Sequence, residues 1–152
     1  MKKYHTASSR ETKKLARKLT KTVLLIENRS SGARVIALYG DLGSGKTTFV
    51  QGCLRATGVR GRITSPTFVL MKRYRISSGR NHFDEIYHLD AYRMKSAREL
   101  DALAFKKILK SPRALIFIEW ASNIKKSLPR KTISLRFGYG EKHGERTISV
   151  KD

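Results

Sequence analysis

The residues best suited to chemistry form one glycine-rich segment, residues 40–47. Its sequence, GDLGSGKT, matches the pattern G-x-x-x-x-G-K-[ST]. The glycines let the chain turn so that successive backbone N–H groups point at phosphate oxygens, and a following helix N-terminus adds positive potential. Lys46 offers a cation for the β- and γ-phosphates, and Thr47 offers a hydroxyl ligand suited to Mg²⁺. We therefore expect nucleotide contacts from Leu42, Gly43, Ser44, Gly45, Lys46, Thr47 and Thr48.

Two acidic residues end apolar runs that are typical of buried strands. Glu119 follows the run ALIFI and Asp90 follows IYHL. A nucleoside triphosphate site needs a carboxylate near Mg²⁺ and a group that orients the attacking water, and both belong at the carboxyl ends of strands beside the phosphate loop. Together with Lys46, the two acids are the catalytic candidates. The sequence leaves open which acid binds the metal and which positions the water.

Two other features allow two interpretations each, and a third allows one. Residues 64–67, with the sequence TSPT, suit either a mobile loop whose hydroxyls sense Mg²⁺ and the γ-phosphate or an ordinary Ser-Pro turn. Trp120 either packs beside a nucleotide or belongs to the core. Cys53 lies on the apolar face of an expected helix and is interpreted as a core residue, because the four histidines show no metal-ligand spacing with it.

The elements that must position these residues alternate between helix and strand. A capping-box sequence at residues 8–11 and apolar residues at helical spacing predict a helix over 9–26. The remaining expected elements are a strand over 35–39, a helix that ends before Gly58, strands over 67–76 and 83–89 joined by a hairpin loop at 77–81, a helix over 96–110 that Pro112 stops, a strand over 114–118, and a closing hairpin of 132–137 and 146–150. This order predicts an α/β three-layer P-loop NTPase-like domain with a mixed β-sheet flanked by helices.

Length and composition set the outer limits. The chain has 152 residues, of which 39% are hydrophobic and 30% charged, which fits one domain over residues 1–152. Its apolar runs are far shorter than the ~20 residues that span a bilayer, and one cysteine cannot form an internal disulfide. We expect a cytoplasmic protein.

The net charge is strongly positive. The chain has 33 basic and 12 acidic residues, a net charge of +21, and the excess is spread along its length. Such a surface suits an anionic partner such as RNA, but a generally basic solvated surface explains the charge equally well. An even spread argues against a nucleic-acid-binding tail.

Four motifs in this order and spacing resemble the TsaE (YjeE) family. They are GDLGSGKTTF at residues 40–49, SPTF at 65–68, HLDAYR at 88–93 and IEW at 118–120, and the resemblance extends from about residue 6 to residue 150. It implies a small bacterial P-loop ATPase that uses ATP and Mg²⁺ and supports the formation of threonylcarbamoyladenosine in tRNA. It also implies work with TsaB and TsaD proteins, of which TsaD does the transfer chemistry, so that contact with tRNA is indirect or uses the basic surface.

The resemblance also implies roles for single residues. Thr47 and Glu119 would bind Mg²⁺, Asp90 would be the catalytic carboxylate near the γ-phosphate, and residues 65–67 would form a switch-like loop. Further nucleotide contacts are implied for Ser9 or Thr12, Thr67, Trp120, Ser122 and Arg146. The chain departs from the family pattern at Ser44, Ala91 and Ala121, where Ala, Leu and Pro are usual, and none of these changes alters the proposed chemistry.

Two other functions remain open on the sequence. A small-molecule kinase can use the same phosphate loop, although the segments between motifs are short for an acceptor site and a lid. A nucleotide-switched RNA-binding protein is suggested by the net charge alone.

Overall fold

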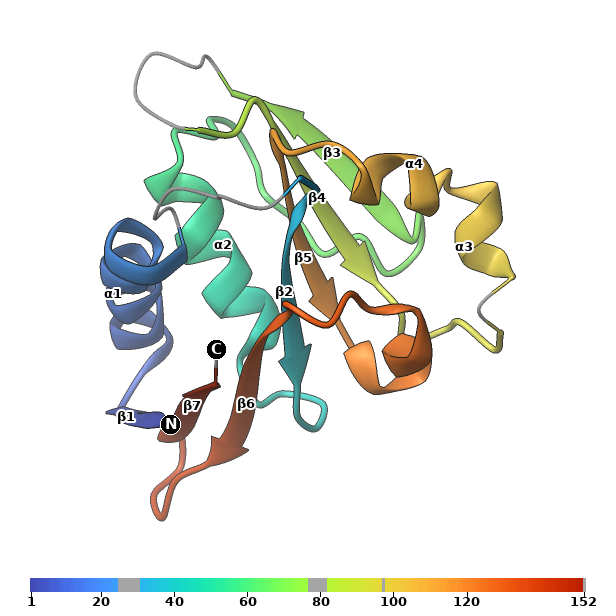
Figure 1. Ribbon diagram of the computed structural model, residues 1–152. Coiled ribbons are helices and arrows are strands. Elements are labelled where there is room, and N and C mark those ends of the chain that lie inside the picture. The colour runs from blue at the N-terminus through green and yellow to red at the C-terminus, as the bar shows by residue number, and fades with distance from the viewer. Residues whose placement is uncertain (25–30, 77–81, 97, 152) are drawn as a thin grey trace.

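The computed structural model describes residues 1–24, 31–76, 82–96 and 98–151, and its centre is a seven-stranded mixed sheet with helices on both faces (Figure 1). The strands are β1 (Lys2–Thr6), β2 (Arg34–Tyr39), β3 (Met71–Arg75), β4 (Glu85–Asp90), β5 (Ala114–Glu119), β6 (Ile133–Tyr139) and β7 (Arg146–Lys151). The helices are α1 (Ser9–Leu19), α2 (Lys46–Ala56), α3 (Glu99–Ala102) and α4 (Phe105–Leu109), with a π-helical turn η1 (Thr20–Leu24) and a 3-10 segment η2 (Ala121–Ser127). The expected α/β mixed-sheet class is confirmed.

The strand order places the functional strands at the centre of the sheet. The order is β1-β7-β6-β2-β5-β4-β3, in which β6, β2, β5 and β4 are mutually parallel and the outer strands pair antiparallel. β5 is buried along its whole length because helices cover both faces of the sheet, which explains its continuous apolar run. The carboxyl ends of the parallel strands therefore meet at one edge, where a ligand site is expected.

Two hydrophobic cores separate the three layers. α1 and α2 pack on one face of the sheet around large buried side chains such as Phe49 and Phe117. The short helices α3 and α4, together with η2, cover the other face around Phe105 and Ile116. None of the described helices is long and apolar enough to cross a membrane.

The start of α1 follows its sequence closely. The Ser8 hydroxyl accepts a hydrogen bond from the Glu11 backbone N–H (3.2 Å), and the Glu11 carboxylate accepts one from the Ala7 N–H (2.8 Å). The Ser8 half of the predicted capping box is therefore confirmed, and the Glu11 side chain bonds to the N–H one residue before the N-cap. The α-helix ends at Leu19 and continues as the π-helical turn η1, and the last two residues of the predicted helix lie outside the described residues.

Several other elements differ from their predicted form. The helix predicted over 96–110 is two short helices, because Ala104 adopts a left-handed conformation (φ 53°) between α3 and α4. The strand predicted from residue 67 begins at Met71, after a turn in which Leu70 also has a positive φ of 62°. β1 and η2 were not predicted, since neither shows a clear apolar period. The predicted loop at 77–81 lies outside the described residues.

Candidate active site

The phosphate-loop segment connects β2 to α2 and depends on glycine backbone geometry. Gly45 has a φ of 99° immediately before α2, a conformation that side chains other than glycine rarely adopt. A Cβ atom at Gly45 would lie 2.6 Å from Cδ and 2.7 Å from Nε of Arg146. Arg146, at the start of β7, therefore lies directly against the loop.

Lys46 is buried at the first turn of α2. Its Nζ donates hydrogen bonds to the carbonyl oxygens of Gly40 (2.8 Å) and Asp41 (2.7 Å) and lies 4.2 Å from the centre of the Trp120 ring. Burial lowers the pKa of Lys46, and the nearby carboxylates of Glu119, Asp90 and Asp41 act in the opposite direction. The ammonium is thus held at the mouth of the loop by oxygen atoms and an aromatic face.

Glu119 ends β5, is only 2% exposed as a residue, and has a hydrogen-bond partner on each carboxylate oxygen. Oε2 accepts a hydrogen bond from the Thr47 hydroxyl (2.7 Å), and Oε1 lies 2.7 Å from Nε2 of His88. A hydroxyl and a carboxylate are hard oxygen donors of the kind that Mg²⁺ prefers, with nucleotide phosphates supplying further ligands. The Thr47–Glu119 pair therefore fits the predicted metal site.

Asp90 ends β4 in direct register with Glu119 of the parallel strand β5. Its Oδ2 accepts a hydrogen bond from the Thr67 hydroxyl (2.6 Å), and its Oδ1 accepts one from the Tyr92 backbone N–H (2.9 Å). The Ser65 hydroxyl lies 2.6 Å from that of Thr67. The Ser-Pro-Thr segment is thus tied by hydroxyl groups to one of the two predicted catalytic acids.

A cavity of about 380 Å³ joins these groups. Its lining consists of Leu42, Gly43, Gly45, Lys46, Thr47, Thr48, Ser65, Thr67, Asp90, Tyr92, Glu119, Trp120 and Arg146. Most of the predicted site residues are therefore brought together. Tyr92, whose ring packs 4.9 Å from that of Trp120, was not predicted, although it lies in the HLDAYR motif.

Four predicted contact residues lie outside this cavity. Ser44 is buried, and its hydroxyl donates to the Asp41 carbonyl (2.8 Å). Thr12 faces the core side of α1, where its hydroxyl lies 2.9 Å from that of Thr6. Ser9 and Ser122 are exposed, at the start of α1 and in η2. Their side-chain contacts to a nucleotide stay predictions that this geometry does not support.

A second cavity of about 680 Å³ adjoins the first through Arg146. It lies between the N-terminal segment and the connection from β6 to β7, and its lining includes Thr6, Ala7, Glu11 and Tyr139. The Tyr139 hydroxyl donates to the Leu42 carbonyl, which links this connection to the phosphate loop. The N-terminal segment thus lines this second cavity through Thr6 and Ala7, and α1 lines it through Glu11, whereas Ser9 and Thr12 line neither cavity.

A family comparison covers nearly the whole chain. The family described as "Threonylcarbamoyl adenosine biosynthesis protein TsaE" matches residues 6–148. Relatives called "tRNA threonylcarbamoyladenosine biosynthesis protein TsaE" include one from Haemophilus influenzae, 31% identical over 116 residues, and one from Bacillus subtilis, 32% identical over 133 residues. Another, from Rickettsia conorii, is 38% identical over 123 residues.

These relatives are longer than the matched segments. The matches cover 76%, 88% and 80% of this chain, and 70%, 75% and 62% of the three relatives in the same order. Among solved structures, the crystal structure of Bacillus subtilis YdiB is similar, with a TM-score of 0.71 and 28% sequence identity over 98% of this chain and 83% of YdiB. The family match thus spans the residues that contain the four motifs, and the structural match extends over nearly the whole fold.

Proposed function

The chain belongs to the TsaE family, and from this premise we propose that it is a Mg²⁺-dependent ATPase that supports threonylcarbamoyladenosine formation in tRNA. The observation that carries the proposal is the convergence of Lys46, Thr47, Asp90 and Glu119 on one cavity behind the glycine-rich loop. Each of the four supplies a group that phosphoryl transfer to water requires.

Binding of the triphosphate is assigned to the loop and to Lys46. Backbone N–H groups of residues 43–47 would surround the phosphates at the N-terminus of α2, where the helix dipole adds positive potential. The Lys46 ammonium would bind the β- and γ-phosphate oxygens. Arg146 lies against Gly45 and lines both cavities, which supports a role in which its guanidinium would bind the nucleotide between phosphates and sugar. The second cavity then offers room for the nucleoside.

Catalysis is assigned to the two strand-terminal acids. Thr47 and Glu119 would hold Mg²⁺, which neutralises charge that develops on the phosphates. Asp90 would orient the attacking water and accept its proton. Thr67 is hydrogen-bonded to Asp90, so movement of the Ser65–Thr67 segment would change the orientation of the catalytic carboxylate.

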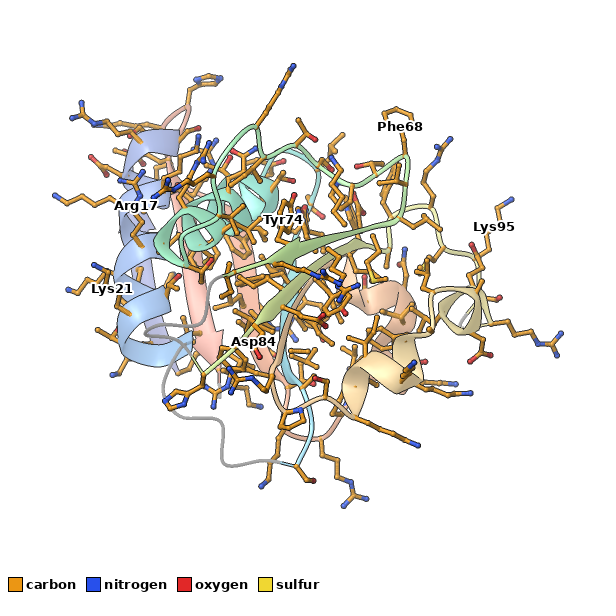
Figure 2. All side chains as sticks on the ribbon, turned by 90° about the horizontal axis from the view of Figure 1, so that it is seen from above. Arg17, Lys21, Phe68, Tyr74, Asp84 and Lys95 are labelled. Atoms are coloured by element: carbon orange, nitrogen blue, oxygen red, sulfur yellow. The ribbon has the colours of Figure 1, made fainter. Side chains whose placement is uncertain are left out.

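Protein partners are the second part of the proposal. The tRNA modification named for the family needs transfer chemistry for which we assign no group in this chain, and TsaB and TsaD counterparts in the cytoplasm would supply it. Phe68 is 87% exposed and Val69 is 57% exposed on the segment that follows Thr67, and Phe68 projects from the molecule (Figure 2). Exposed apolar side chains beside a catalytic switch suit contact with a protein that controls turnover.

The experiment measures ATP hydrolysis by the pure protein, alone and with its TsaB and TsaD counterparts and tRNA. We expect slow hydrolysis by the chain alone and faster hydrolysis with the partners, and no turnover when EDTA removes Mg²⁺. The Lys46→Ala variant controls for a contaminating ATPase. Absence of both stimulation and binding to the partners would contradict the proposal, and a phosphorylated acceptor in place of free phosphate would favour a kinase.

A further inference from the structure

His88 is a buried polar residue to which the proposed reaction gives no role. It lies in β4 with its side chain fully buried, and its Nε2 atom is 2.7 Å from Oε1 of Glu119. Within the part of the chain that the structure describes, its Nδ1 atom has no hydrogen-bond partner. The hydrogen bond of the imidazole thus goes to Glu119, the carboxylate that we propose binds Mg²⁺.

The hydrogen bond from His88 fixes the orientation of the Glu119 carboxylate, which the side chain's own torsional preferences leave weakly determined. The terminal torsion of a glutamate side chain is broad, so either oxygen can face a given neighbour. In this protein the two oxygens have different partners, with Thr47 on Oε2 and His88 on Oε1. Removal of the His88 donor would leave a buried carboxylate oxygen unsatisfied and free the carboxylate to rotate.

The sheet itself delivers His88 to this position. His88 is in register with Phe117 of β5, two residues before Glu119, so His88 and Glu119 project from the same face of neighbouring strands. Helix α2 packs on that face and carries Thr47. Three elements therefore meet at one carboxylate: β5 carries it, and α2 and β4 each contribute one hydrogen bond to it.

We propose that His88 is a positioning residue that orients Glu119 for Mg²⁺, and so sets how strongly the site couples metal to nucleotide. This inference rests on the proposed function, since it concerns the metal of that site. Partners in the second layer around a metal ligand usually change metal affinity by about 10–100-fold when they are removed. His88 would act on Mg²⁺ through Glu119 and would not touch the nucleotide.

The test separates the metal-dependent part of binding from the rest. A fluorescent ADP analogue is titrated against the full chain with excess Mg²⁺ and, in parallel, with EDTA. Mg²⁺ is also titrated at a saturating concentration of the analogue, and in His88→Leu we expect the affinity for Mg²⁺ to be about 10–100-fold weaker. The affinity of this variant for the analogue in EDTA should be nearly unchanged. A residue needed only for packing would weaken both titrations equally.

Two amide variants guard against a folding defect. Glutamine places an N–H donor near the position of histidine Nε2, whereas asparagine is one methylene shorter and cannot reach Glu119. His88→Gln should therefore retain most of the Mg²⁺ effect and His88→Asn should lose it. Equal behaviour of the two amides, or loss in EDTA as large as in Mg²⁺, would overturn the role of His88. If the unchanged protein binds the analogue with no effect of Mg²⁺, both this inference and the proposed Mg²⁺ site are wrong.

Discussion

Lys46 and Glu119 are ionic residues with exposed fractions of only 4% and 2%. Lysine and glutamate are seldom buried this far unless their polar atoms are paired. Here the Lys46 ammonium bonds to two loop carbonyls, and the Glu119 carboxylate bonds to Thr47 and His88. The desolvation of both groups is therefore offset locally, and both are held in place at the cavity.

The first prediction removes these two groups one at a time. Lys46→Ala and Glu119→Ala should each lower ATP hydrolysis by at least about 100-fold, the first by loss of phosphate charge and the second by loss of metal placement. A phosphate-release assay with partners present measures the effect. Lys95→Ala, which changes an exposed lysine, is the matched control. Normal turnover in either site variant would show that the site is misassigned.

The second prediction concerns Cys53, which is fully buried on α2. Burial raises the pKa of its thiol from 9.0 to about 12. The folded protein therefore disfavours the thiolate. The contribution of the neutral thiol to the free energy of unfolding is fully present below pH 9 and is lost as the pH rises toward 12. Between these limits the free energy of unfolding should fall by about 1.4 kcal/mol per pH unit from this one group.

Comparison with Cys53→Ala isolates the thiol from the tyrosines and lysines that titrate in the same range. Urea unfolding at pH 8 and pH 10.5 should show a smaller decrease in stability for the variant than for the unchanged protein. The native thiol should also react slowly with a thiol reagent at pH 8 and rapidly in urea. Equal decreases for the two proteins would contradict the raised pKa.

At the scale of elements, the division between α3 and α4 has a single backbone cause. Ala104 lies at φ 53° and ψ 30° between the two helices, and its side chain is exposed. A left-handed conformation is costly for a residue with a Cβ atom. The helical periodicity over 96–110 does not reveal this break, because alanine favours a continuous helix.

The third prediction replaces that alanine. Ala104→Gly should raise the free energy of unfolding by about 0.5–1 kcal/mol, because glycine adopts a positive φ without steric cost. Ala102→Gly is the matched control, since Ala102 is exposed within α3 and glycine there should destabilise by a similar amount. Chemical denaturation measures both variants. A shift in the same direction for the two would show that the backbone at Ala104 is not strained.

At the scale of the whole molecule, the net charge of +21 is dispersed over the surface. Arg17 of α1 and Lys21 of η1 project on one side, and Lys95 projects on the opposite side (Figure 2). Dispersed cations attract a polyanion without selecting one orientation. The charge is thus better suited to keeping tRNA near the assembly than to recognising its sequence.

The fourth prediction tests this view. The chain alone should bind tRNA with a Kd on the order of 10⁻⁴–10⁻⁶ M at physiological salt, and the logarithm of the affinity should fall linearly with the logarithm of salt concentration. An unrelated RNA of equal length should bind equally well. Fluorescence anisotropy across a salt series measures both. Tight, salt-resistant and tRNA-selective binding would contradict the prediction and favour a dedicated RNA-binding function.

Residue types and their order along the chain were enough to predict the glycine-rich loop, the class of fold and the two acids at strand ends. These depend on local order along the chain: GDLGSGKT sits between a buried strand and a helix, and Asp90 and Glu119 follow buried apolar runs. The parallel sheet then brings such strand ends to one edge. The same logic does not reveal β1, which pairs with β7 at the other end of the chain.

Which side chains touch depends on how the elements pack in three dimensions. The contact of His88 with Glu119 depends on the register of β4 against β5, and that of Arg146 with Gly45 depends on where β7 begins. The tertiary structure also places Thr12 in the core, where its hydroxyl pairs with that of Thr6. These contacts join residues from separate elements, and a shift of one residue in strand register would turn each strand side chain to the opposite face. Residue types and spacing therefore indicate the chemistry, and strand register and helix packing determine which groups perform it.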